Sequence, residues 1–352
     1  MEIDMKTVDV EHLQMVLSWV REPEDIFGTD PDLVKPTFRT LAKLLHPDMR
    51  TGETELAMSV LNSFYEQARA NIAAGIYGKG WDYSSIAQIA KCEFFLRYIY
   101  SQNEVTTDYS TRGNVILRIP HAASTNDLMQ AEVDALMRLA VIDDGVRMFF
   151  PMLESTLMTK TPAGIKRLNV LAYNSITENP NHLLSLRQLG SYYHNRLHPK
   201  QAAWIWRKLL VALDTAHGAG VVHGSINPDC ILLEPEDHLL LLTQWECSTL
   251  DLKPIVAQSS AGFYPSEINL NGQTTYGLDL YMAAETMRWV GLNAMPDEMA
   301  RYFAWIASDS TMGRVQDTSV ALLEFNVLIH KLWGAPKYTP MDDLLWPVGK
   351  AL

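Results

Sequence analysis

The segment 218–246 holds the residues of this chain whose types and spacing come closest to those of a catalytic centre. Phosphoryl transfer assisted by a hard divalent cation needs a general base and oxygen ligands for the cation. Among the polar residues that follow His223 in this segment are Ser225, Cys230 and Gln244. A serine is no general base at neutral pH, a thiol is a poor ligand for a hard cation, and an amide carries no charge to offset one. The segment therefore has the spacing of a catalytic loop without the groups that do the chemistry.

This segment resembles the catalytic region of a protein kinase. Kinases carry His-Arg-Asp-x-x-x-x-Asn followed by a strand that ends in Asp-Phe-Gly. The loop aspartate accepts the substrate proton, and the asparagine and the second aspartate hold magnesium. The equivalent positions here are Ser225, Cys230 and Gln244. The resemblance implies a kinase-like fold that has lost phosphoryl transfer, a pseudokinase that needs no metal or other cofactor.

The resemblance covers about residues 88–335 and extends to the strand that carries the ATP-binding lysine in kinases. Arg118 ends a Val-Ile-Leu-Arg run at that position, and Glu132 matches the acidic partner of the lysine. Arginine has a planar fork and does not replace a compact ammonium against phosphates. No glycine lies between Gly80 and Gly113, so the glycine-rich phosphate loop is missing. We expect an Arg118–Glu132 pair that supports the lobe without serving ATP.

Four further positions match structural residues of the kinase fold. His223 takes the place of a packing histidine, and Asp279 resembles a helix aspartate that braces the backbone of the catalytic loop. Glu267 ends a Tyr-Pro-Ser-Glu segment that resembles the close of the activation loop, and Arg314 matches the arginine that pairs with it. The resemblance implies that all four support the fold and that none supports activity.

Two acidic residues leave an alternative open. Asp229 lies beside the position of the magnesium asparagine, and Glu246 falls two residues beyond the position of the metal aspartate. If the loop shifted, these carboxylates could hold an ion. The alternative function is then an atypical ATP-dependent kinase with displaced acidic ligands.

A second motif lies near the amino terminus, where His46-Pro47-Asp48 follows a helix-like run. This run and its flanks, about residues 22–72, resemble a J-domain, the DnaJ-type co-chaperone module. Lys35, Arg39 and Lys43 are spaced four residues apart and therefore form a basic ridge on one helix face. A localised patch of that kind favours an acidic partner surface. The resemblance implies that the ridge and the His-Pro-Asp loop contact a DnaK-type heat-shock ATPase and stimulate its hydrolysis.

The pattern of apolar residues predicts the elements that position these motifs. Apolar spacing predicts a first helix over 10–20 and a second from Asp30-Pro31 to Leu45, although Pro36 makes a later start near Lys35 equally possible. A third helix is expected to about Ile72. The inward residues expected on that third helix are Leu56, Val60, Phe64 and Ala68.

Beyond the third helix the pattern changes to short strands and then to long helices. Strands are expected over 94–100, 114–120, 148–153 and 168–173, and two more over 230–233 and 239–243. One helix is expected among the first four strands, over 125–141. Strands followed by helices suit a small β-rich lobe and a larger helical lobe. The expected fold class is α+β. The expected domains are a J-domain with an extra amino-terminal helix (1–72), a linker (73–86), a kinase-like domain (87–335) and a tail (336–352).

Net charge and cysteine content limit the classes of partner and the compartment that are expected for this chain. The 352 residues carry a formal net charge of −12, which argues against a general nucleic-acid or membrane-surface binder, since both need a cationic face. The three cysteines form no Cys-x-x-Cys pair, and no signal peptide or membrane-length apolar run is found. A cytoplasmic protein is expected. Its predicted function is that of an adaptor whose J-domain engages a DnaK-type chaperone while the kinase-like domain binds a client, or else of a regulatory decoy that sequesters the chaperone.

Overall fold

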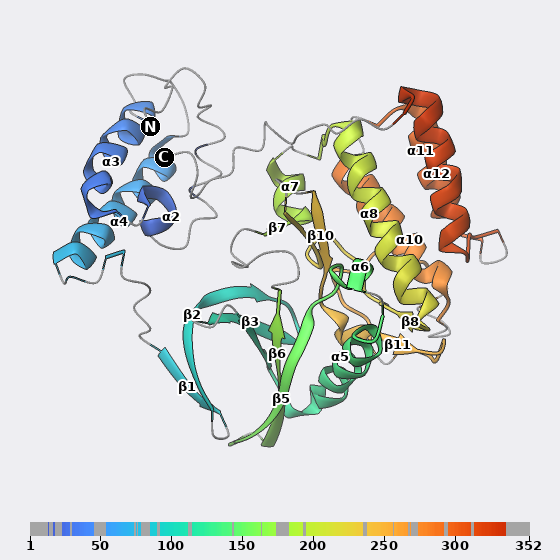
Figure 1. Ribbon diagram of the computed structural model, residues 1–352, viewed down its shortest axis with the longest axis horizontal. Helices are drawn as coiled ribbons and strands as arrows, with labels where there is room; N and C mark the ends of the chain where they lie inside the picture. The colour runs from blue at the N-terminus through green and yellow to red at the C-terminus, as the bar shows by residue number, and fades with distance from the viewer. Residues whose placement is uncertain are drawn as a thin grey trace. The chain divides into compact units, whose positions relative to one another are not determined.

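A computed structural model of the chain forms two compact units that divide between Ser85 and Ile86 (Figure 1). We call them the helical unit and the larger unit. The structure describes residues 13, 17, 23–28, 30–45, 54–73, 75, 77–78, 85–89, 92–111, 115–142, 144–162, 164–173, 183–192, 195–234, 238–255, 257–266, 268, 274–291, 295–310 and 313–335.

The second predicted helix is formed and takes the earlier of its two possible starts, as α3 (Pro31–Leu45). The Asp30 carboxylate accepts a hydrogen bond from the backbone N–H two residues on, at 2.9 Å, and so caps the helix. Pro31 occupies the first turn, where no intrahelical bond is lost. Val34 is buried in that same turn, and its packing holds the helix together across Pro36.

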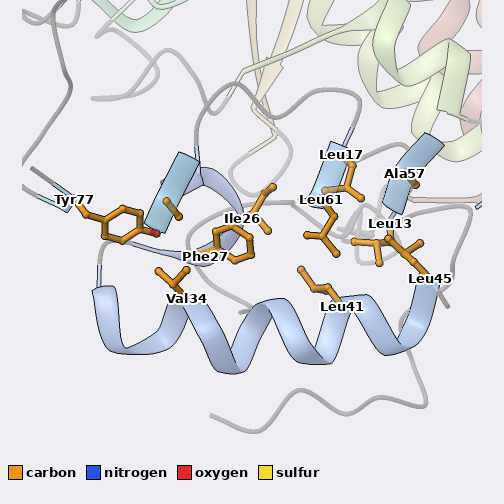
Figure 2. Close-up of a cluster of buried hydrophobic side chains, with 11 residues drawn as sticks. Leu13, Leu17, Ile26, Phe27, Val34, Leu41, Leu45, Ala57, Leu61 and Tyr77 are labelled. Atoms are coloured by element: carbon orange, nitrogen blue, oxygen red, sulfur yellow. The ribbon is translucent and has the colours of Figure 1, made fainter. Parts of the chain in front are cut away.

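The helical unit is completed by α2 (Pro23–Phe27) and α4 (Thr54–Ala73), which pack on α3 around one apolar cluster (Figure 2). The short helix α2 was not expected, because five residues are too few to show a helical period. The expected first helix over 10–20 lies largely outside the described residues. The buried members of the cluster are Leu13, Leu17, Ile26, Phe27, Val34, Leu41, Leu45, Ala57, Leu61, Ala68 and Tyr77.

The inward face of α4 agrees with the prediction at Val60, Phe64 and Ala68, which pack in or against the apolar cluster, and differs at Leu56. Leu56 was expected to point inward, yet it is 77% exposed, whereas Leu61 is completely buried. The apolar stripe of this helix is wide, so periodicity alone does not fix its centre. Tyr65 of the same helix stacks on Phe38 of α3 with ring centroids 3.9 Å apart.

The larger unit begins with a six-stranded sheet in the order β1-β2-β3-β4-β6-β5. The paired strands from β2 to β6 run antiparallel to their neighbours. The strands are β1 (Ser85–Ile89), β2 (Cys92–Gln102), β3 (Thr106–Thr111), β4 (Val115–Pro120), β5 (Met152–Thr161) and β6 (Gly164–Ala172), and the helix α5 (Asn126–Leu139) follows β4.

Three parts of this sheet differ from the sequence prediction. β1 begins inside the segment expected to be a linker. β3 was missed because its sequence, Thr-Thr-Asp-Tyr-Ser-Thr, has no apolar alternation, although five of its six residues are buried. The strand expected over 148–153 begins only at Met152, because a short helix, α6 (Asp144–Arg147), and a turn precede it.

The rest of the larger unit is mainly helical, as expected. Its core holds aromatic side chains in edge-to-face contact, and the indole Nε1 of Trp206 donates to the hydroxyl of Tyr302 at 3.2 Å. None of the described helices is long and apolar enough to cross a membrane. The remaining elements include β7 (Leu184–Ser185), α7 (Leu186–Tyr192), α8 (Pro199–Gly218), β8 (Val221–Val222), β9 (Ile231–Glu234), β10 (Leu239–Leu242), β11 (Thr249–Leu250), α10 (Tyr276–Gly291), α11 (Asp297–Ile306) and α12 (Thr318–Trp333).

Candidate functional site

Arg118 is the centre of a buried ionic group that joins the sheet to the segment after β10. Only 1% of the residue is exposed. Its Nε and Nη2 donate to the two carboxylate oxygens of Asp108 at 2.8 and 2.7 Å, a bidentate pair set by the direct register of β3 and β4. Its Nη1 contacts Glu132 of α5, and lies 3.3 Å from Oε2 of Glu246. We call these four residues the Arg118 cluster.

Neighbouring amides and a hydroxyl satisfy the remaining carboxylate oxygens of the Arg118 cluster. Asn169 donates from Nδ2 to Glu132 at 2.9 Å and to the carbonyl of Met129 at 3.0 Å. Asn103 donates to Glu246 at 2.6 Å, and Ser101 donates to Asp108 at 2.9 Å. A buried charge is tolerated only when such partners are present. The guanidinium is thus fully committed to protein groups.

The Arg118 cluster has more carboxylates than cations. Burial disfavours the charged form of Glu132 and outweighs the pull of Arg118, and the nearby Glu246 adds repulsion, so the pKa of Glu132 rises to about 7. Burial alone would lower the pKa of Arg118, but the carboxylates of Asp108, Glu132 and Glu246 together raise it well above its ordinary value. Near neutral pH the cluster therefore holds an exchangeable proton on Glu132.

The turn between β2 and β3 consists of Asn103, Glu104 and Val105 and contains no glycine. The side-chain oxygen of Asn103 accepts hydrogen bonds from the backbone N–H groups of Val105 and Thr106, at 2.8 and 2.7 Å. Glu104 accepts from the backbone N–H of Ser260 at 2.6 Å and also from its hydroxyl. Burial would raise the pKa of Glu104, but these hydrogen bonds outweigh it and lower the pKa. The turn is therefore bonded to two segments far along the chain.

The loop between β8 and β9 is braced by Asp279 of α10. Asp279 accepts from the backbone N–H groups of His223 and Gly224 at 2.7 and 2.9 Å, and its Oδ2 lies 3.0 Å from Nε2 of His217. Gly224 has φ +75°, and a Cβ there would lie 2.5 Å from the carbonyl oxygen of Cys247, so only glycine fits. The structure thus brings together two of the predicted structural residues, His223 and Asp279.

His223 is buried and neutral in character. Burial lowers its pKa against the opposing effects of Asp279 and the backbone carbonyl of Thr243, which lies 2.8 Å from Nε2. The ring packs on Trp245 with centroids 4.6 Å apart. This placement agrees with a packing residue rather than a proton carrier.

The three degenerate positions offer little to a cation. Ser225 is buried, and the Cys230 thiol donates to the backbone carbonyl of Asn227 at 3.1 Å. Burial raises the pKa of Cys230, which keeps it a thiol at neutral pH. Gln244 has a left-handed backbone with φ 62°. None of these three side chains is a carboxylate, the protein ligand that usually holds Mg²⁺.

The two acidic residues considered as displaced ligands are both paired with arginines. Asp229 accepts from Nε of Arg187 at 2.6 and 2.7 Å. Glu246 belongs to the Arg118 cluster. Within the described part of the chain, no group of three or more histidine, cysteine, aspartate or glutamate residues has the arrangement of a metal site.

The other predicted residues are placed as follows. Lys35, Arg39 and Lys43 are all exposed on α3. Arg314 is buried, donates from Nε to the carbonyl of Ser308 at 2.9 Å, and lies over the ring of Tyr281 at 4.7 Å. Glu267, its expected partner, and His46, Pro47 and Asp48 lie outside the described residues.

Sequence reasoning missed several residues of this site, above all Asp108, Asn103 and Asn169. Asp108 had a readable signal, because it lies opposite Arg118 once the Thr-Thr-Asp-Tyr-Ser-Thr run is taken as a strand. Asn169 gave no signal, and neither did the contact of Asn103 with Glu246, since these partners lie far away in the sequence.

Comparison with known proteins adds a likeness of fold. No protein-family model matches the chain, and no curated protein matches it in sequence. The structure is similar to the crystal structure of the kinase domain of a Toxoplasma gondii specific rhoptry antigen, with a TM-score of 0.49 and 12% identity, over 68% of this chain and 83% of that one. A likeness at this level says nothing of activity, and the arguments below depend on this chain's own residues.

Proposed function

We propose that this protein is a non-catalytic adaptor, in which a pseudokinase unit binds a client or partner protein and a J-domain-like unit engages a DnaK-type chaperone. The Arg118 cluster carries the first half of the proposal. In kinases the lysine at this position pairs with one helix glutamate and still reaches the ATP phosphates. Here the cation is bound to three carboxylates and cannot serve phosphates without leaving them uncompensated.

The turn between β2 and β3 supports the same conclusion. In kinases the loop that covers the phosphates is rich in glycine, because the backbone must approach the phosphates closely. The corresponding turn here places Asn103 against Glu246 and Glu104 against Ser260. Its side chains are thus engaged with protein groups of the same unit.

The chaperone half of the proposal is supported by the helical unit. The basic ridge of Lys35, Arg39 and Lys43 is solvent-exposed along α3, on the opposite face from the buried Val34, Leu41 and Leu45. The His-Pro-Asp segment follows the end of this helix directly. An exposed basic face beside such a segment suits an acidic surface on an ATPase.

Two measurements test the two halves separately. Calorimetric titration of the protein with Mg²⁺ and ATP should give no heat of binding; saturable binding would instead favour the atypical kinase. Steady-state ATP hydrolysis by a bacterial DnaK-type chaperone should rise when the protein is added. His46→Gln should abolish that rise without changing the thermal unfolding temperature.

Charge variants refine the chaperone test. Arg39→Glu reverses the centre of the basic ridge and should reduce stimulation, whereas Lys200→Glu, an equally exposed site on α8, should not. Stimulation that is the same in all variants would contradict the co-chaperone proposal. Stimulation without capture of any client would favour the decoy.

A further inference from the structure

The outward face of α12 carries three exposed apolar side chains. Val320, Leu323 and Val327 are 43%, 63% and 60% exposed, and we call them the outer stripe. Their spacing of three and four residues places them in one row over two helical turns. The opposite face of the helix packs inward through Thr318, Ala321 and Phe325. The helix, red in Figure 1, is therefore apolar on both faces.

The outer stripe differs from the other exposed apolar residues of the described part of the chain. The remaining described helices show at most two large hydrophobic side chains that are exposed to a comparable degree. Single exposed apolar residues are ordinary, but a continuous row along a helix marks a contact surface. Removing apolar side chains from water is favourable, so covering this row contributes to affinity.

Two charges beside the outer stripe indicate what covers it. Glu324 and Lys331 are both exposed and lie seven residues apart, which puts them on the same edge of the row, two turns from each other. Val327 lies almost midway between them. In an antiparallel pair of identical helices, a twofold axis near Val327 brings Glu324 of one copy opposite Lys331 of the other, and does so twice. A parallel pair would instead place the equivalent charges on opposite edges of the interface, where this Glu–Lys pairing is lost.

We propose that the outer stripe of α12 binds a second copy of this chain as an antiparallel helix pair with its twofold axis near Val327. The surface is self-complementary in both its apolar row and its charges. One helix face per copy is at the small end of specific interfaces, so the dimer is reversible, with a dissociation constant on the order of 10 μM. The proposal is independent of what the kinase-like and helical units bind.

Sedimentation equilibrium of the full chain over a wide concentration range tests the proposal. The wild type should dimerise reversibly. Glu324→Lys and Lys331→Glu should each weaken the dimer by about tenfold, because each sets like charges opposite each other. The double variant Glu324→Lys/Lys331→Glu should restore dimerisation, since the swapped charges again match. Lys200→Glu, on the exposed side of α8, is the matched control and should leave the dimer unchanged.

A crosslink tests the position of the axis. In a Cys92→Ser background, Val327→Cys should form an intermolecular disulfide on mild oxidation, and Met137→Cys, an equally exposed site on α5, should not. Circular dichroism melts of each variant exclude loss of fold as the cause. A wild type that stays monomeric, as it would if another part of the same chain covered the stripe, overturns the proposal. A dimer whose dissociation constant is unchanged by both single charge reversals also overturns the proposal.

Discussion

Two buried charge networks in the larger unit are built in opposite ways. In the Arg118 cluster a buried cation is balanced by side-chain anions, with more carboxylates than cations. At Asp279 a buried anion is balanced mainly by backbone N–H groups of the loop that follows β8. The first network depends on which side chains are ionised, and the second depends on the shape of the backbone. The first should therefore respond to charge removal and pH, and the second to loop geometry.

The largest expected effect is that of removing the cation. Arg118→Met leaves buried carboxylates without their partner and should lower the free energy of unfolding by about 3–5 kcal/mol. The same substitution at Arg138, whose ion pair with Asp251 is 3.5 Å long and exposed, should change it by no more than about 0.5 kcal/mol. Urea denaturation of both variants measures the difference. Equal losses would mean that the Arg118 cluster is not the stabilising network described.

A smaller loss is expected in the backbone-balanced network. Asp279→Asn turns one acceptor oxygen into a donor that faces a backbone N–H of the loop, and should lower the free energy of unfolding by about 1.5–3 kcal/mol. Asp309→Asn is the control, since its carboxylate accepts only a 3.4 Å bond from the Tyr281 hydroxyl in an exposed setting. If Asp279→Asn were as mild as the control in urea denaturation, the loop would not depend on this brace.

The pH dependence separates the two networks further. The pKa of Glu132 is raised from 4.5 to about 7, so the folded state binds this proton more tightly than the unfolded state does. Its contribution to stability is full below pH 4.5 and is lost as pH rises through 7. Glu132→Gln keeps the shape but cannot titrate, and should flatten this fall in urea denaturations at a series of pH values. Glu285→Gln, in a partly exposed pair with Arg288, should keep the wild-type slope.

The smallest effect is expected at the exposed bond between the β2–β3 turn and Ser260. Hydrogen bonds from Ser260 lower the pKa of Glu104, so its contribution is present at neutral pH and is lost as pH falls through the lowered pKa. Because the site is exposed, Glu104→Gln should lower the free energy of unfolding by less than about 1 kcal/mol at pH 7. Glu154→Gln, an exposed site on β5, should have no effect. A loss as large as that of Arg118→Met would show that the turn is a principal support of the unit.

The sequence predicts the long helices and strands of this fold, but the prediction fails where contacts with distant residues, rather than apolar periodicity, decide the structure. The helices α3 and α5 and the strand β4 are close to their expected ranges, because each has a clear apolar period. β3 has no apolar period, because most of its buried residues are polar and make hydrogen bonds in the interior. The error at Leu56 has another cause, because the apolar stripe of α4 is wide and periodicity does not fix its centre.

The candidate site shows the same division. The contact between Arg118 and Glu132 could be anticipated from a strand followed by a helix. The position of Glu246 could not, because it reaches Arg118 from 128 residues further along the chain. Sequence reasoning offered Glu246 as a displaced metal ligand, whereas in the folded chain its carboxylate accepts from Arg118 and Asn103. Local patterns carry no information about a partner at that separation.

The β2–β3 turn has a consequence for the motions of the chain. The Asn103 side chain accepts hydrogen bonds from the backbone N–H groups of Val105 and Thr106. The Glu104 carboxylate accepts one from the backbone N–H of Ser260. Amide hydrogens bonded in this way exchange with solvent only when the structure around them opens. We therefore expect slow exchange at Val105, Thr106 and Ser260, in a place where a turn of three residues would ordinarily exchange fast. Any ligand that needs this turn displaced must first break these hydrogen bonds, so its binding waits for a local opening of the turn.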